Sequence, residues 1–205
     1  MTKFLFIRHG QLEGENRKVL HHFQDPVSLS REGKETMQKI APYLVDTSPS
    51  ILYTSPETRT KESAEMLAST LGIQINTLPS LTGRDWGDFA GKEWNEVEHI
   101  LREKTLEERY LYKPPRGESW KTFEERILGA LADIAGKEMG VVGVIAHGSV
   151  IRVLLPKVFG VGTEESLDLY PDYGSVSSVK YDEGSYRDPE LHLESLGEGV
   201  LSSRP

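Results

Sequence analysis

The chain of 205 residues contains no cysteine. Disulfide bonds, thiolate metal sites and cysteine nucleophiles are therefore excluded. Positive charge is also scarce, because 24 lysines and arginines stand against 32 aspartates and glutamates and give a formal net charge of −8. This balance argues against nucleic acid or an anionic membrane as a partner bound by bulk electrostatics. A local cluster of arginine and histidine would oppose the overall charge, so it would be informative.

Long hydrophobic runs are missing as well. No apolar stretch approaches the length of a membrane span, and no signal peptide precedes the first predicted strand. We therefore expect a cytoplasmic protein with no membrane partner. A hydrophobic content of 37% and a charged content of 27% are typical of globular proteins, and one domain over residues 1–205 is the expected organisation.

Two short apolar runs each end in a histidine and a glycine. The first is Phe4–Ile7, followed by Arg8, His9 and Gly10, and the second is Val141–Ala146, followed by His147 and Gly148. Such runs predict strands that are buried on both faces of a sheet. If the two strands are neighbours, both imidazoles lie at the carboxyl edge of the sheet, where open α/β sheets bind ligands.

The rest of the chain predicts strands that alternate with helices. Helices are expected at about 31–45, from Ser55 as capping residue to Gly72, and from Ser119 or Thr122 to about Gly136. A further helix should follow His147, and Pro156 should kink or end it. Strands are expected at 50–54 and 73–78, and a hairpin from 175–181 and 191–196. This order favours an α/β fold, a three-layer α/β/α sandwich with a mainly parallel central sheet.

Two further segments are expected outside this core. A charged helical pattern at about 92–112, with a thin apolar face, predicts a small helical lid that ends by about residue 116. The glycine- and serine-rich residues at about 196–205 predict a flexible tail.

Arg59 lies in the first turns of the helix after the second strand, so it comes from the same edge of the sheet. Arg8, His9, Arg59 and His147 should then converge. Two guanidiniums and two imidazoles beside helix N-termini suit a dianionic tetrahedral group such as phosphate. A neutral histidine whose Nδ1–H is held by a carbonyl presents Nε2 as a nucleophile, and the other three groups would stabilise the equatorial oxygens.

These residues resemble the signature of the histidine phosphatase superfamily, in its phosphoglycerate mutase-like branch. The similar segments are Phe4–Gly10, Leu29–Gly33, Tyr53–Pro56 with Arg59 and Ser63–Glu65, Gly117–Ser119 and Ala146–Gly148, in the family's order over roughly residues 3–180. The resemblance implies that His9 is the phosphorylated nucleophile and that Arg8, Arg59, His147 and Gly148 bind phosphate. It also implies no metal and no organic cofactor.

The chain departs from the family where the proton donor is expected. The family's segment Leu-x-Glu-x-x-aromatic-Gly corresponds to Leu81–Gly87, so Gly83 stands in place of the acid. Loss of a general acid–base typically lowers a rate by ~10²–10⁴-fold. Asp85 is the predicted local substitute, because residues two apart in extended backbone point to the same side. Its side chain is one methylene shorter than glutamate.

Other family positions near the first motif are altered. Leu12 replaces a small hydroxyl residue, and Asn16 falls one position later than the family's asparagine. Gln11 is compatible with the family pattern. Gln11 and Asn16 are therefore weaker candidates for substrate binding.

The leading hypothesis is a phosphatase that hydrolyses a small phosphorylated metabolite through a phosphohistidine at His9. A phosphoglycerate mutase-type phosphoryl transfer is the first alternative, and the short lid without a long basic insertion favours hydrolysis over it. The second alternative, motivated by Gly83, is a catalytically weakened member that binds a phosphorylated ligand.

Overall fold

The computed structural model describes residues 1–14, 19–22, 25–159, 169–185, 188–196 and 202–203. Its main sheet has six strands in the order β3-β2-β4-β1-β6-β7. The strands are β1 (Thr2–Arg8), β2 (Ile51–Thr54), β3 (Gln74–Thr77), β4 (Gly140–Ala146), β6 (Val176–Ser185) and β7 (Asp188–Leu196). The pairs among β3, β2, β4 and β1 are parallel, whereas β6 pairs antiparallel with β1 and with β7. The expected hairpin is therefore confirmed as β6 and β7.

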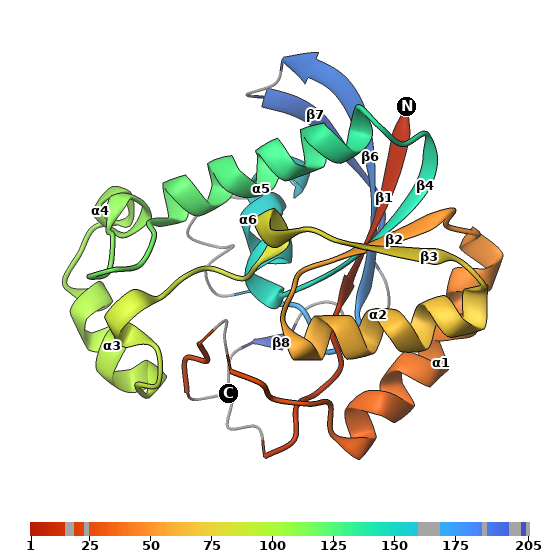
Figure 1. Cartoon of the computed structure of the whole chain (residues 1–205). Coiled ribbons are helices and arrows are strands. Elements are labelled where there is room, and N and C mark those ends of the chain that lie inside the picture. The colour runs from red at the N-terminus through yellow and green to blue at the C-terminus, as the bar shows by residue number, and fades with distance from the viewer. Residues whose placement is uncertain (15–18, 23–24, 160–168, 186–187, 197–201, 204–205) are drawn as a thin grey trace.

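Helices cover both faces of the sheet (Figure 1). They are α1 (Arg31–Thr47) and α2 (Thr58–Leu71) on one face, and α5 (Trp120–Ala135) and α6 (Gly148–Phe159) on the other. The predicted α/β/α sandwich is confirmed. At one end of the molecule lie α3 (Trp94–Arg102) and α4 (Leu106–Leu111), the segment predicted as a lid. Short 3₁₀ turns occupy Pro79–Leu81 and Gly87–Phe89.

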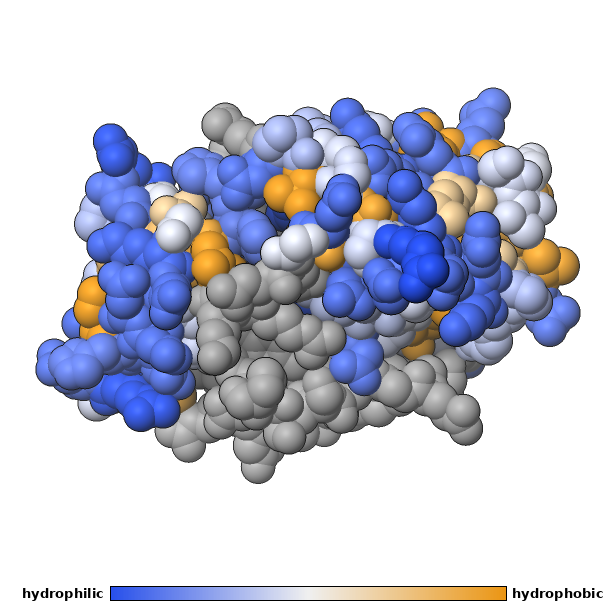
Figure 2. Space-filling model, turned by 90° about the horizontal axis from the view of Figure 1, so that it is seen from below, coloured by the Kyte–Doolittle hydropathy of each residue, from blue (hydrophilic) through white to orange (hydrophobic). Residues whose placement is uncertain are grey.

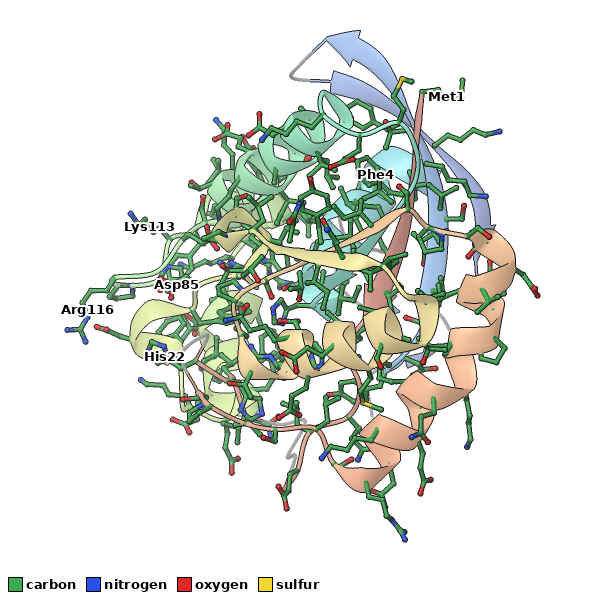
Figure 3. The ribbon with its side chains drawn as sticks, turned by 45° about the vertical axis from the view of Figure 1, so that its right-hand side comes forward. Met1, Phe4, His22, Asp85, Lys113 and Arg116 are labelled. Carbon is green, nitrogen blue, oxygen red and sulfur yellow. The ribbon has the colours of Figure 1, made fainter. Side chains whose placement is uncertain are left out.

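The central strand β1 is buried on both faces, as its unbroken apolar run predicts. Phe4 and Phe6 pack with α5 and α6 in one hydrophobic cluster, whereas Leu5 and Ile7 pack with α1 and α2 in the other. In Figure 3, Phe4 lies among the packed side chains beside the sheet. All four side chains are at most 1% exposed, and burial of each contributes about 1.5–3 kcal/mol. This double burial fixes the strand whose end carries Arg8 and His9.

The two strands that end in histidine are direct neighbours. β1 pairs parallel with β4, with Arg8 opposite Ala146, so His9 and His147 leave the same edge of the sheet at matched positions. The backbone N–H of His9 donates to the carbonyl oxygen of Ala146 at 3.1 Å. The predicted neighbourhood of the two strands is thus confirmed.

Several local expectations differ from the structure. Ser55 does not cap α2, whose N-cap is Glu57 without a side-chain hydrogen bond; the hydroxyl of Ser55 instead pairs with that of Thr60. The helical stretch at 92–112 is two helices, because Thr105 begins α4 with a capping box. Pro156, expected to kink or end the last helix, does not end α6, which continues to Phe159.

Ser119, one of the two candidates, caps α5 by accepting from the N–H of Thr122. Of the predicted tail at 196–205, the structure describes Leu196, which ends β7, and β8 (Ser202–Ser203), which pairs with β5 (Leu169–Tyr170). The remaining tail residues lie outside the described part.

The described surface agrees with the composition of the chain. Seen from below in Figure 2, it is mainly hydrophilic, and its hydrophobic residues form scattered spots rather than one continuous patch. Within the described ranges, no helix has the length and apolar character that a membrane span requires.

Two glycines bring the start of α1 against the loop after β1. A Cβ atom on Gly33 would lie 2.2 Å from the carbonyl oxygen of Gln11, and one on Gly10 would lie 2.7 Å from the carbonyl oxygen of Gly33. In addition, the N–H of Ser30 donates to the carbonyl of Gln11 at 2.9 Å. The backbone beside His9 therefore has no room for side chains at these two positions.

We predict that Gly33→Ala lowers the free energy of unfolding by about 1–3 kcal/mol, because the new methyl group overlaps the Gln11 backbone. Gly136→Ala is the matched control, since a Cβ atom there would meet its nearest neighbour at 3.4 Å. The control should change the free energy by less than about 0.5 kcal/mol. Urea unfolding followed by circular dichroism measures both. Equal effects of the two substitutions would contradict this account of the close approach.

Candidate active site

His9 is held in one orientation and one tautomer. Its Nδ1 lies 2.8 Å from the carbonyl oxygen of Gly10, which can only accept, so Nδ1 carries the proton and Nε2 carries the lone pair. The side chain is 5% exposed. Burial lowers the pKa of His9 well below its ordinary value, and the neighbouring His147, Arg8 and Arg59 lower it further. His9 is therefore a neutral imidazole with a free electron pair on Nε2.

His147 lies beside His9, with the two ring centroids 5.3 Å apart and the rings inclined at 65°. Nε of Arg59 donates to Nδ1 of His147 at 3.4 Å, which leaves the proton of the neutral ring on Nε2. Nε2 in turn lies 3.0 Å from the hydroxyl oxygen of Ser55. Burial lowers the pKa of His147; Glu57 opposes this shift, while Arg59 and Arg8 add to it.

Arg8 is positioned by the segment before β6. Its guanidinium carbon lies 3.8 Å from the ring centroid of Tyr173, and Nη1 donates to the carbonyl of Pro171. A Cβ atom on Gly148 would lie 3.3 Å from Nε of Arg8, so the glycine leaves room for this side chain. The Tyr173 ring also lies 5.6 Å from the His9 ring. Sequence reasoning missed Tyr173, because no motif distinguishes it.

Arg59 is 6% exposed and reaches the site from the first turn of α2. One turn later, Ser63 donates to the carbonyl of Arg59 at 2.8 Å and accepts from the N–H of Gly10 at 3.2 Å. This link holds the start of α2 against the loop that carries His9. The structure thus brings Arg8, His9, Arg59 and His147 together, as expected from the edge of the sheet.

A buried carboxylate that sequence reasoning missed belongs to the same cluster. Glu57 is 4% exposed, and its Oε1 lies 3.0 Å from Nε2 of His147 and 3.3 Å from the backbone nitrogen of Gly83. Burial alone would raise the pKa of Glu57, but the contacts with His147 and Ser55 outweigh burial and lower it. The sequence shows only an acidic residue at a helix start, so nothing distinguishes Glu57 from an ordinary first-turn acid.

Comparison with known proteins shows the family of this chain. Residues 4–191 match the histidine phosphatase superfamily (branch 1). The chain belongs to this superfamily.

Individual relatives are distant but cover nearly the whole chain. The uncharacterized phosphatase PhoE of Bacillus subtilis (strain 168) is 26% identical over 205 residues, which cover 98% of this chain and 100% of PhoE. The structure of YhfR from Bacillus stearothermophilus has a TM-score of 0.81 at 24% identity, with 98% of both chains covered. That of the mycobacterial glucosyl-3-phosphoglycerate phosphatase Rv2419c has a TM-score of 0.77 at 18% identity, over 98% of this chain and 99% of Rv2419c. Both structures share the fold of this chain.

The weaker candidates from the sequence occupy other places. Oδ1 of Asp85 accepts from the N–H of Gly87 at 2.9 Å, within the turn that leads toward the lid. Figure 3 shows Asp85 on the side of the molecule where Lys113 and Arg116 project outward. Gln11 is exposed, and Asn16 lies outside the described residues.

A buried arginine connects the lid to the loop of Gly83. Arg84 is enclosed by Trp86 and Trp120, with its guanidinium carbon 4.2 Å and 4.8 Å from their ring centroids. It donates to the carbonyls of Glu118 at 3.2 Å and Tyr112 at 3.4 Å. Burial lowers the pKa of Arg84 to about 9, so it remains charged at neutral pH. Arg84 therefore anchors this loop.

The described residues contain no group of three or more histidine, cysteine, aspartate or glutamate side chains that could hold a metal ion. The chemistry of the cluster is that of two imidazoles, two guanidiniums and one carboxylate. Such a set can bind a phosphoryl group and accept it on a histidine nitrogen.

The two neutral histidines predict a pH dependence of stability. Below about pH 6.5, a histidine of the unfolded chain gains a proton, whereas folded His9 and His147, whose pKa values are lowered, stay neutral. The unfolded state then binds more protons, so the free energy of unfolding falls as the pH falls, by about 1.4 kcal/mol per pH unit for each histidine.

His9→Gln should reduce this slope between pH 6.5 and the lower folded pKa values by about half, as measured by urea unfolding at a series of pH values. His99→Gln, at an exposed position of α3, is the control for loss of a histidine outside the buried cluster. An unchanged slope for His9→Gln would mean that His9 is protonated in the folded protein.

Proposed function

We propose that this protein is a phosphatase that hydrolyses a small phosphomonoester through a phosphohistidine at His9. One observation carries the proposal: the buried imidazole of His9 donates Nδ1–H to Gly10 and keeps the lone pair of Nε2 beside three cationic or hydrogen-bonding groups. A neutral imidazole in this tautomer is a competent nucleophile toward phosphorus.

The reaction has two steps at the same nitrogen. In the first, Nε2 of His9 attacks phosphorus and the bond from phosphorus to the ester oxygen breaks, so that the alcohol leaves with a proton. In the second, water attacks the phosphohistidine, the P–N bond breaks and inorganic phosphate is released. Arg8, Arg59 and His147 bind the non-bridging oxygens and stabilise their charge in both transition states.

Hydrolysis is favoured over the two alternatives by features of the lid and of the carboxylate. The lid consists of α3 and α4 alone, without a long basic insertion that would retain a bisphosphate while it reorients, which disfavours a mutase. Binding without turnover was motivated by Gly83, but Glu57 brings a carboxylate to the Gly83 amide. PhoE and Rv2419c are named phosphatases, which also supports hydrolysis.

Rapid mixing with ³²P-labelled p-nitrophenyl phosphate should give one acid-labile, alkali-stable phosphoryl group per chain, formed in step with a burst of p-nitrophenolate. His9→Asn should abolish both the label and the burst, because it removes the nucleophilic nitrogen. Circular dichroism of the variant controls for its fold. If neither p-nitrophenyl phosphate nor an alkyl phosphate such as glycerol 1-phosphate labels the wild-type protein, the proposed function is wrong.

A further inference from the structure

The proposed reaction needs a group that protonates the leaving alcohol and later takes a proton from water. We infer that the carboxylate of Glu57 is this group and that it acts from the N-terminus of α2 in place of the side chain that Gly83 lacks. The inference rests on the proposed function, because it assigns a role within the same reaction. Glu57 would touch the reacting oxygen and is therefore proposed as a catalytic residue.

The first support is the place of the carboxylate. Oε1 of Glu57 lies 3.3 Å from the backbone nitrogen of Gly83 and 3.0 Å from Nε2 of His147. The family's acid would project from residue 83, which is a glycine here, and Glu57 places a carboxylate next to that residue. Glu57 is the N-cap of α2, which follows β2, and Gly83 lies in the loop that follows β3, so both segments start from the same edge of the sheet.

The second support is an oxygen with unused hydrogen-bonding capacity. Oε2 of Glu57 is buried and has no hydrogen-bond partner among the described residues. A buried carboxylate oxygen without a partner is unfavourable, so its retention needs a reason such as a proton or a ligand atom that binds there. The leaving oxygen of a phosphomonoester, and then the attacking water, would supply this missing partner.

The third support is the space around Gly83. A Cβ atom at residue 83 would lie 3.2 Å from Cγ of His147, closer than an ordinary van der Waals contact. Glycine at this position therefore lets the imidazole of His147 lie against the loop, where its Nε2 meets Glu57. The absence of a side chain at Gly83 is therefore compatible with the position of the Glu57 carboxylate beside His147.

Glu57 gives up one proton in the first step and regains one in the second. For the first step Glu57 must carry a proton on Oε2 when substrate is bound, and the negative charge of an ester dianion close to the carboxyl group favours this form, because a like charge raises the pKa of a carboxyl group. As His9 attacks and the P–O bond breaks, this proton passes to the leaving oxygen and gives the alcohol. The carboxylate then takes a proton from the water that attacks the phosphohistidine, and the electron pair of the P–N bond returns to Nε2.

Other carboxylates nearby are already engaged. Asp85 accepts from the N–H of Gly87, and Glu118 pairs with Arg126 and accepts from the N–H of Asp85. Neither pairing includes His9 or His147. Asp85, the substitute acid expected from the sequence, is therefore the natural competitor to test against Glu57.

The test is Glu57→Gln, which keeps an oxygen acceptor for the His147 and Gly83 contacts but removes the transferable proton. Phosphorylation of His9 is measured in single turnovers with p-nitrophenyl phosphate and with glycerol 1-phosphate. Because nitrophenolate needs little protonation, the loss should be ~10²–10⁴-fold for the alkyl ester and at least about 10-fold smaller for the aryl ester.

Asp85→Asn is the matched control, and it should leave the ratio of the alkyl to the aryl rate constant unchanged. If Glu57→Gln slows both esters equally, Glu57 only positions His147 and the inference is overturned. It is also overturned if neither ester is affected, or if Asp85→Asn shows the loss that depends on the leaving group. In all these outcomes the phosphohistidine still forms, so failure of this inference is distinct from failure of the proposed function.

A second variant restores the acid at its family position. Gly83→Glu in the Glu57→Gln background should recover the alkyl rate by at least about 10-fold, whereas Gly83→Ala in the same background should not. Equal alkyl rates for these two double variants would contradict the inference that Glu57 acts in place of an acid at residue 83. Should Glu57→Gln fail to fold, Glu57→Asp, which keeps the charge but shortens the reach, must show a smaller loss with the same dependence on the leaving group.

Discussion

The parallel pairing of β1 with β4 is the constraint on which the rest of the site depends. It sets Arg8 opposite Ala146 and joins the first residue beyond β1 to the last residue of β4 through the backbone hydrogen bond from His9 to Ala146. Each strand delivers a histidine at its end, so the distance between the imidazoles follows from the register and not from flexible loops. Parallel strands buried on both faces resist a shift of register, because a shift by one residue would exchange the faces of every side chain.

Much of the fold, and the convergence of Arg8, His9, Arg59 and His147 at one edge of the sheet, could be predicted from the sequence. Unbroken apolar runs identify buried strands, and the position of Arg59 after β2 places it at the correct edge, because sheet geometry converts sequence order into spatial proximity. The boundaries were less predictable. Ser55 has the residue type of a helix cap, but its hydroxyl pairs with that of Thr60 in the first turn of α2 and lies 3.0 Å from Nε2 of His147, a tertiary contact that no local rule anticipates.

The carboxylate half could not be predicted, for a physical reason. The side chain of Glu57 contacts the backbone N–H of Gly83, and no sequence pattern in either segment predicts this contact. Asp85 was the reasonable local choice because alternation in an extended segment points it toward the position of residue 83. The backbone there is not simply extended: it turns at Gly87, whose φ of 52° suits glycine, and the turn engages the Asp85 carboxylate.

The place of β1 in the sheet also determines when the site can exist during folding. β1 is the first strand of the chain, yet its partners are β4 and β6, which come from the opposite half of the sequence. Contacts between residues far apart in sequence form slowly, because a long loop must close before they contribute. His9 therefore gains its neighbour only when most of the sheet has assembled, and a chain that has folded only through α2 holds Arg59 and Glu57 without His147. Return of the proposed activity during refolding would consequently report the completed topology rather than the early formation of helices.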